Sequence, residues 1–451
     1  MTPADGDRPE ATLAAFVARL TYDDVPDAAR TTIERAFVDT VGVTLAGSVA
    51  DAGTRAAVFA TSVGTGETTV LGTGETASLT DAVLANGTAG HALDYDDLSW
   101  AMDGHPSVPL VAPALAVGEY VDATGADLVT AFAAGFEAEC YVAEPVSPTH
   151  YEQGWHPTAT FGTFGATAAA ASLLDLDERA TARALTIAAS MPSGLKRNFG
   201  TMTKPLHAGL AGRSGVTAAL LARDGFTADE TAISGDRGFW DRYAEGAAHV
   251  ADPPGDPWRL EETGISIKAY PCCYFTHTSI ALASQLADDH GLAPDDVERV
   301  EATTSRGASD ALVHADPETG LEAKFSMEYA LAAALVFDRV GLDAFDSEAL
   351  ADPAVQHVRE RATFVVDDSL AYKSNHARVA VETVDGERYE AELAAPPGTP
   401  ANPLSESELR EKFLECATFV LDRPAAADAF ADLRALRKCE SVRDLLASLC
   451  V

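Results

Sequence analysis

The sequence predicts a mainly α-helical protein in which the N- and C-terminal parts of the chain form one large all-helical domain. A smaller α+β domain is inserted between these two parts. Long alanine-rich runs fill the first half, strand-like alternation begins only after Gly264, and helical patterns return after the proline-rich loop 395–403. Most of the early runs are apolar on more than one face, as in helices buried inside a large domain.

Each helix expected in the first half is an apolar run bounded by Gly, Pro or Asp. Asp177 is an expected N-cap, because its carboxylate can accept hydrogen bonds from free N–H groups of the first helical turn. The expected helices cover residues 12–20, 27–46, 79–89, 108–121, 128–142, 163–174, 178–189 and 206–223.

The middle of the chain mixes strands and helices. Asp385-Gly386 separates two alternating runs and is a strong signal for a β-hairpin. We expect strands at 297–304, 363–366, 378–384 and 387–393, and helices at 279–289 and 325–337. The closing helices, 406–421 and 425–449, are expected to pack back onto the first half. This predicts a helical domain of residues 1–264 and 401–451 and an α+β domain of residues 265–400.

Composition narrows the function classes. The 451 residues carry a net charge of −37, which disfavours nucleic acid and anionic membranes as partners. Lysine is scarce, with seven in the chain, and this balance is typical of a halophilic protein. No apolar signal segment or long apolar run is present, and the six cysteines include no Cys-x-x-Cys pair. We therefore expect a reduced, cytoplasmic protein.

The segment 91–107 is the strongest candidate for acid–base chemistry, because it places His91, Asp94, Asp96 and His105 in one short stretch. Carboxylates crowded beside imidazoles shift one another's pKa values, which points to use in a site. A solvated acidic loop is the alternative. These four residues are also conceivable metal ligands, but their spacing matches no recognised metal motif, so we expect no metal.

Two histidines precede prolines at expected helix starts, His105 before Pro106 and His156 before Pro157. A helix start offers free N–H groups and a positive dipole end, which favour carboxylate ligands. A capping histidine is the alternative for either one alone.

Three further segments hold candidate residues. The stretch 193–207 is the one clearly cationic island, and we expect it to wrap an anion unless it is ordinary surface charge; its members are Lys196, Arg197, Lys204 and His207. Lys268 lies at the expected domain junction, where clefts are common. Cys272 and Cys273 are expected to pack in the interior, with a role as nucleophiles as the alternative. Tyr329 is either a proton donor or a half-buried core residue.

Five ordered motifs together resemble the MmgE/PrpD family, which includes 2-methylcitrate dehydratase, cis-aconitate decarboxylase and iminodisuccinate epimerase. They are His-x-x-Asp-Tyr-Asp-Asp at 91–97, His-Pro-Ser at 105–107, Gly-Trp-His-Pro at 154–157, Thr-Lys-Pro-Leu-His-Ala-Gly at 203–209 and Lys-x-Tyr-Pro-Cys-Cys at 268–273. The resemblance implies a lid-like α+β domain, a homodimer, small di- or tricarboxylate substrates and no metal or organic cofactor. It implies catalytic roles for Asp94, His105, His156, Lys204, Lys268 and Tyr329. We add Ser99, Arg197, His207 and His277 as expected substrate-binding residues.

The expected function is that of a lyase using carbanion or enolate chemistry, with a 2-methylcitrate dehydratase-like hydro-lyase ranked first. The alternatives are a cis-aconitate decarboxylase, an epimerase of a substituted succinate, and a degenerate dimeric scaffold. Two details leave the reaction open. A threonine of the decarboxylase branch would fall near Leu98 or Ser99, and the spacing from Asp94 to His105 is one residue longer, which counts against decarboxylation. Ser107 is followed by Val108-Pro109 where dehydratases continue with Asp-Asn, which is closer to the epimerase-like and decarboxylase-like members.

In the expected mechanism His105 or His156 moves the carbon-bound proton, while Asp94 orients a histidine or acts as the base. Lys268 and Tyr329 would protonate the leaving hydroxyl or the enolate. Nearby cations would stabilise the negative charge that develops on the substrate.

Overall fold

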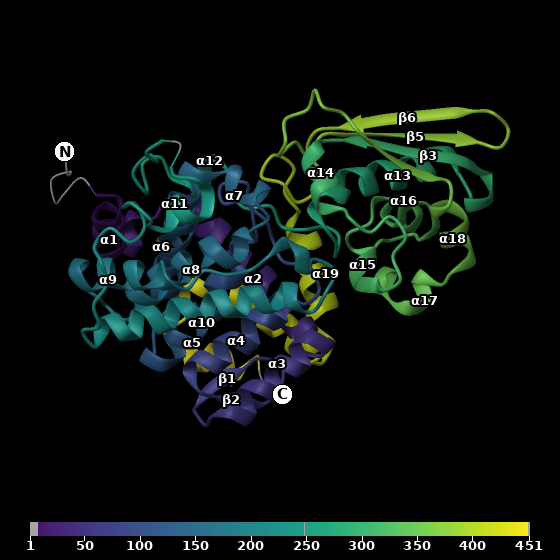
Figure 1. Cartoon of the computed structure of the whole chain (residues 1–451). Coiled ribbons are helices and arrows are strands. Elements are labelled where there is room, and N and C mark those ends of the chain that lie inside the picture. Colours follow the sequence, from purple (N-terminus) through teal and green to yellow (C-terminus); the bar gives the residue numbers. More distant parts are fainter. Residues whose placement is uncertain (1–7, 248, 450–451) are drawn as a thin grey trace.

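A computed structural model describes residues 8–247 and 249–449 and shows a large helical domain beside a smaller α+β lid domain (Figure 1). One hydrophobic core runs from Leu13 to Ile267 and resumes from Leu404 to Leu449. A second core lies wholly within the lid domain, from Cys272 to Val381. The predicted fold class, a discontinuous helical domain with an inserted α+β domain, is therefore confirmed. The domain limits at 264/265 and 400/401 stay a prediction.

The helices of the first half follow the predicted pattern closely. The helix at 108–121 has the expected limits, and Asp177 caps the helix at 178–188 by accepting a hydrogen bond from Ala180 N. The helices are α1 Pro9–Arg19, α2 Asp27–Ser48, α3 Asp51–Val63, α4 Leu79–His91, α5 Val108–Val121, α6 Gly125–Ala143, α7 Thr149–Glu152, α8 Pro157–Leu173, α9 Glu178–Ala188, α10 Thr203–Arg223, α11 Phe239–Ala244 and α12 Arg259–Glu262.

The sequence analysis did not expect helix α3, a small β-hairpin, or the short helices α7, α11 and α12. Helix α3 lies between α2 and a small antiparallel hairpin of β1 (Thr68–Val70) and β2 (Glu75–Ala77). The domain is therefore not purely helical. These strands have only three residues each, too few for the period-2 alternation that reveals a strand.

Helices α4 and α10 cross at a pair of glycines. A Cβ atom on Gly87 would lie 2.9 Å from the Cα of Gly209, and one on Gly209 would lie 2.3 Å from Leu84 O. The absence of side chains lets the two backbones approach closely. This crossing sets α10, which begins beside Lys204, against α4, which ends at His91.

The C-terminal helices α19 (Glu406–Ala417), α20 (Arg423–Arg434) and α21 (Val442–Ala447) pack on α2 and α5, as predicted. The single helix expected at 425–449 is wrong, because a short 3-10 turn at Leu436–Lys438 divides it. The Cys439 carbonyl accepts a hydrogen bond from Gly125 N at 2.9 Å. The backbone there is thus tied to the start of α6 and does not continue its own helix.

The lid domain holds a four-stranded sheet in the order β4-β3-β5-β6. Its strands are β3 (Val297–Thr304), β4 (Ala362–Val366), β5 (Ala377–Thr383) and β6 (Arg388–Leu393). β4 is parallel to β3, whereas β5 is antiparallel to β3 and to β6. The hairpin predicted at Asp385-Gly386 is present, and Gly386 adopts a left-handed φ of 86°.

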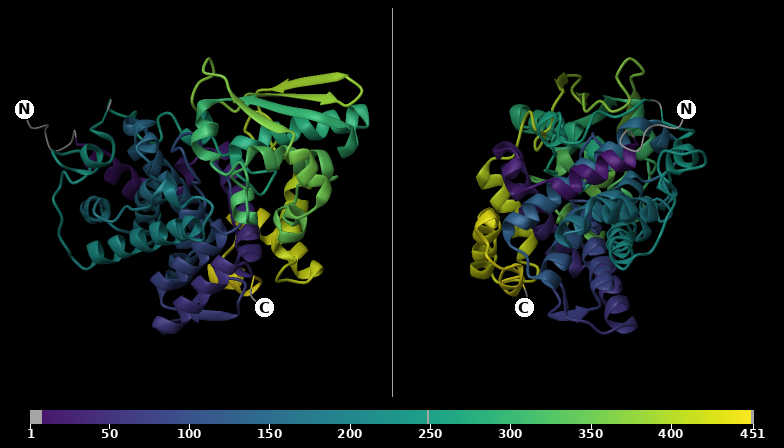
Figure 2. Two further views of the ribbon diagram at one scale, coloured as in Figure 1. Left: turned by 45° about the vertical axis from the view of Figure 1, so that its right-hand side comes forward. Right: turned by 90° about the vertical axis from the view of Figure 1, so that its left-hand side faces the viewer.

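Helices α13 (His277–His290) and α16 (Met327–Val336) lie on one side of this sheet, as the two views of Figures 1 and 2 show. The shorter lid helices are α14 Arg306–Ala311, α15 Gly320–Ala323, α17 Ser347–Leu350 and α18 Pro353–Arg359. The five described cysteines are free thiols, and Cys450 lies outside the described residues. Among the described helices, none is both long and apolar enough to cross a bilayer.

Candidate active site

A cavity with about 600 Å³ of empty space, part of it open to solvent, is lined by residues of both domains. The helical domain contributes most of the polar side chains at its wall, among them Asp94, Asp103, His105, His156 and Lys204. The lid side contributes Cys273 and Lys373, and aromatic side chains come from both domains. The full lining is Asp94, Leu98, Trp100, Asp103, Gly104, His105, Tyr151, His156, Phe199, Lys204, Cys273, Tyr274, Phe275, Ala311, Phe325, Tyr372 and Lys373.

Helix starts bring three of the polar groups to this cavity. His156 is the N-cap residue of α8, and Lys204 lies in the first turn of α10. His105 stands shortly before α5. Because helix N-termini present free N–H groups and a partial positive charge, this end of the bundle favours an anionic ligand.

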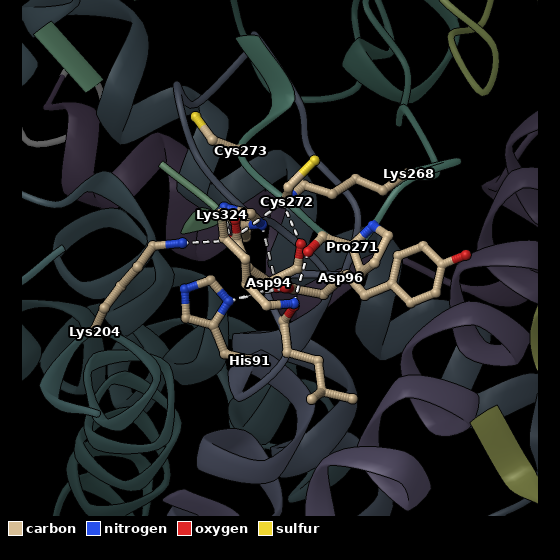
Figure 3. A network of polar contacts seen from close by, with 12 residues as sticks. His91, Asp94, Asp96, Lys204, Lys268, Pro271, Cys272, Cys273 and Lys324 are labelled. Atoms are coloured by element: carbon tan, nitrogen blue, oxygen red, sulfur yellow. Dashed lines mark hydrogen bonds and ion pairs between the residues drawn. The ribbon is translucent and has the colours of Figure 1, made fainter. Parts of the chain in front are cut away.

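Asp94 is the hub of the site. Its Oδ1 atom forms an ion pair with the Lys204 ammonium and lies 3.2 Å from Lys268 Nζ (Figure 3). Burial alone would raise the pKa of Asp94, but these two ammonium groups outweigh it and hold the pKa well below its usual range. Asp94 also has a left-handed φ of 53°, a conformation that costs an L-residue on the order of 1–2 kcal/mol.

Asp96 orients the histidines. Its carboxylate lies 2.8 Å from His91 Nδ1 and 3.2 Å from His105 Nδ1. Asp94 lies farther from His105, at 3.7 Å from its Nε2. Of the two carboxylates, Asp96 is therefore the closer partner of the histidine rings, and the expected roles of Asp94, orienting a histidine or acting as the base, stay a prediction.

Burial keeps the cavity histidines His105 and His156, and the buried His91 beside them, in the neutral form at pH 7. Burial lowers the pKa of His91 to about 3 against the opposing effect of Asp96, and it also lowers the pKa of His105. Burial and the neighbouring His207 hold the pKa of His156 well below its usual range. A neutral imidazole has one donor and one acceptor nitrogen, so it can accept or return a proton.

His156 and His207 are joined by a hydrogen bond between their Nδ1 atoms, at 3.1 Å. One ring must donate and the other accept. His207 is not among the described cavity-lining residues, so the structure gives no support to its expected substrate contact and instead places it against the ring of His156.

Lys268 and Tyr329 do not reach the cavity wall in the described structure. Lys268 is fully buried and donates to the Asp94 backbone carbonyl at 2.7 Å. Tyr329 is buried in the lid core, where its hydroxyl donates to Ala344 O at 2.5 Å. The structure gives no support to the prediction that these two residues protonate a substrate, because both donors are engaged inside the protein.

Three expected substrate-binding residues also lie elsewhere. The Ser99 hydroxyl donates to Gly264 O at 2.7 Å, and Arg197 is exposed to solvent. His277 is buried with its Nε2 3.3 Å from Cys272 O. None of the three belongs to the described cavity lining.

Several cavity residues were missed by sequence reasoning. Lys373 of the lid pairs with Asp103 at 2.5 Å, and both line the cavity. Cys273 lines it as well, where burial and the Asp94 charge raise the pKa of the thiol to about 11. The scarcity of lysine was a usable signal for Lys373, whereas the aromatic lining residues gave none.

The ligand atoms of His91, Asp94, Asp96 and His105 lie within 4.8 Å of one another, close enough to hold a metal ion. Two ammonium groups already contact Asp94. A divalent cation beside them would meet strong repulsion at that range. The charges at this cluster fit an anionic ligand better than a metal.

Comparison with known proteins identifies the class that this fold and site define. The chain matches the MmgE/PrpD N-terminal domain over residues 11–250 and the MmgE/PrpD C-terminal domain over residues 270–435. The protein therefore belongs to the MmgE/PrpD family, as its motifs predict.

Similar curated proteins are cis-aconitate decarboxylases. The chain is 26% identical to the cis-aconitate decarboxylase of Mus musculus over 357 residues, covering 76% of this chain and 73% of the relative. The Homo sapiens enzyme of the same name is 26% identical over 355 residues, with the same coverage. A cis-aconitate decarboxylase-like protein, oryM of Aspergillus oryzae, is 28% identical over 398 residues and covers 81% of each chain.

Proposed function

We propose that this protein is a lyase for a small di- or tricarboxylate, and that it releases carbon dioxide from cis-aconitate or a close analogue. The names of the similar proteins support decarboxylation. They support it better than the 2-methylcitrate dehydratase reaction, which the sequence analysis ranked first. Dehydration becomes the second candidate.

The observation that carries the proposal is the convergence of Asp94, His105, His156 and Lys204 on one cavity. Lys204 supplies a fixed cation for a substrate carboxylate, and the two neutral imidazoles supply positions for proton transfer. The apolar and aromatic part of the lining keeps the remaining substrate surface away from water, which strengthens each charged contact.

Decarboxylation requires a cation that stabilises the developing negative charge and a group that delivers one proton to carbon. The carbon–carbon bond to one carboxylate breaks, carbon dioxide leaves, and the electron pair remains on a carbanion conjugated with the double bond. One proton then adds to carbon, so the reaction consumes one proton for each carbon dioxide released. Lys204 stabilises the developing charge, and His105 or His156 delivers the proton.

Incubation with a panel of acids in deuterated water tests this function. The panel holds cis-aconitate, citrate, 2-methylcitrate and a substituted succinate, followed by NMR and by carbon dioxide release. We expect carbon dioxide from cis-aconitate and one deuterium bound to product carbon. Lys204→Met removes this activity, and Lys438→Met, a change at an exposed lysine, retains it.

Other outcomes would overturn the proposal in distinguishable ways. Water loss from 2-methylcitrate without carbon dioxide would assign a dehydratase. Deuterium exchange without net conversion would assign an epimerase. If none of the acids reacts or exchanges deuterium, a scaffold role is favoured.

A cytoplasmic homodimer without metal or organic cofactor completes the proposal. The MmgE/PrpD resemblance supports the dimer and the absence of a cofactor, and the composition supports the compartment. Sedimentation at several protein concentrations tests the dimer, since a mass of one chain, 47.1 kDa, at all of them would contradict it.

A further inference from the structure

Three consecutive backbone carbonyls around Asp94 each accept a hydrogen bond from a different buried lysine. Lys324 Nζ donates to Leu93 O at 2.5 Å. Lys268 Nζ donates to Asp94 O at 2.7 Å, and Lys412 Nζ donates to Tyr95 O at 2.8 Å. We call Lys268, Lys324 and Lys412 the lysine clamp. Figure 3 shows Lys268 and Lys324 gathered at Asp94, with Lys204 reaching in from the side.

The clamp residues are lysines, which are scarce in this chain, and all three are buried. The chain has seven lysines, and the three clamp lysines are each at most 5% exposed. Burying an ammonium group is costly unless its donors are used. A surface role, such as solubility, therefore does not account for these three side chains.

The clamp lysines come from separate parts of the fold. Lys412 lies on α19, where its ammonium also contacts Asp39 of α2 at 2.6 Å and Lys268 O at 2.9 Å. Lys324 follows α15 in the lid domain and also donates to Pro271 O at 2.7 Å. The clamp thus connects three parts of the fold to the turn at Asp94. These parts are helix α19, the segment that links the two domains, and the lid domain.

We propose that Lys324 and Lys412 are positioning residues that, together with Lys268, hold the left-handed turn at Asp94 and so fix its carboxylate against Lys204 and His105. The proposal rests on the proposed function for the catalytic importance of Asp94. It goes further because it assigns a positioning role to Lys324 and Lys412, which are not among the described cavity-lining residues. Because Lys324 belongs to the lid, it also makes the geometry of Asp94 depend on where the lid sits.

Backbone chemistry explains why such a turn needs the clamp. A buried loop carbonyl must find a donor, and charged donors make stronger hydrogen bonds than neutral ones. Three such bonds on successive carbonyls fix the orientation of each peptide plane at 93–95. Without them the residue relaxes toward right-handed backbone, which L-residues prefer, and its carboxylate swings away from Lys204.

The test compares variants that lack one clamp donor with controls that keep all three. Lys412→Met together with Asp39→Asn removes the donor without leaving an unpaired carboxylate. Asp39→Asn alone is the matched control, since it keeps the Lys412 donor. Lys324→Met is a second, independent variant, because the described contacts of its ammonium are backbone carbonyls. Lys438→Met controls for loss of an exposed lysine.

Hydrogen–deuterium exchange without substrate gives the first readout. We expect faster exchange confined to peptides spanning 92–98 in the Lys412→Met/Asp39→Asn and Lys324→Met proteins, and wild-type exchange in both controls. Unchanged exchange at 92–98 in both variants would overturn the proposal. A uniform rise across the chain would also overturn it, because it would mean a general structural role.

Turnover gives the second readout. We expect kcat to fall roughly 10²-fold, as for a small misplacement of a catalytic group. The acid limb of kcat/KM should move to higher pH, because Asp94 loses ammonium contacts that favour its charged form. A loss of folded protein alone would lower the rate without moving this limb. If wild-type protein turns over none of the acids, the proposed function fails, while the exchange experiment still decides the clamp.

Discussion

The carboxylate of Asp96 lies 3.2 Å from Nδ1 of His105 and is itself fully buried behind the cavity wall. Such a carboxylate fixes the ring and its tautomer, so that the other nitrogen is free for proton transfer. His91 contacts the same carboxylate through its own Nδ1. One buried acid therefore organises two of the site's imidazoles.

Asp96→Asn should lower kcat by roughly 10²-fold or more, the range that positioned acid–base groups contribute. The amide nitrogen cannot accept a hydrogen bond from an imidazole N–H. Steady-state kinetics measures the effect. Asp97→Asn is the matched control, because burial raises the pKa of Asp97 well above its usual range and its contacts are to Ser107. Equal losses in the two variants would contradict a specific role for Asp96.

Tyr329→Phe should leave turnover unchanged and lower the free energy of unfolding by about 1–2 kcal/mol, the worth of a buried hydrogen bond. The hydroxyl bonds to Ala344 O inside the lid core, away from the cavity. Steady-state kinetics checks the turnover, and urea denaturation of the same preparation measures the free energy of unfolding. A large fall in kcat would restore the catalytic role that the sequence suggested.

Acidification from pH 7 to pH 5 should destabilise the protein partly through His91. Burial lowers the folded-state pKa of this histidine to about 3, below the unfolded value of about 6.5. The unfolded state therefore binds more protons between these values, and stability falls as pH drops. At pH 5 the contribution is roughly 2 kcal/mol.

His91→Asn should remove that part of the pH dependence, since asparagine does not titrate. Urea unfolding of both proteins at pH 5 and pH 7, in the same salt, measures it. Asp94 and Asp96 do not interfere, because their lowered pKa values keep both charged across this range. Identical pH dependence in the two proteins would show that His91 is not held neutral.

Dialysis against a chelator should leave turnover unchanged. The ammonium groups of Lys204 and Lys268 already neutralise the Asp94 carboxylate. Their positive charge would repel a metal cation at the same carboxylate. Activity before and after dialysis, with metal analysis of the purified protein, tests this. Loss of turnover that a divalent ion restores would assign a metal to the cluster of His91, Asp94, Asp96 and His105.

The sequence could predict the helical architecture because long apolar runs with capping residues are local signals. It also indicated Asp94, His105, His156 and Lys204, since each lies in a dense motif or beside a helix start. Asp96 lies in the same motif as Asp94, and only its distance to two ring nitrogens separates their roles.

Other parts of the site depend on contacts that leave no local pattern. Lys412 sits in an ordinary helix and meets Tyr95 across 317 residues of sequence. The motif at Tyr329 fits both a core residue and a proton donor, and only the packing of the lid places its side chain in the core. The scarcity of lysine was the one signal for Lys324 and Lys412. It marks these residues as unusual but does not predict which groups they contact.

The most direct test of the whole account is the binding of a non-reactive polyacid, propane-1,2,3-tricarboxylate, measured by calorimetry in molar salt. At that ionic strength the Debye length is only about 3 Å, so affinity must come from direct contacts. We expect wild-type protein and Lys438→Met to bind the acid, and Lys204→Met to bind it about 10- to 100-fold more weakly, as for loss of one charged hydrogen bond. An unchanged Kd in Lys204→Met would contradict the claim that this cavity holds a small polycarboxylate on Lys204.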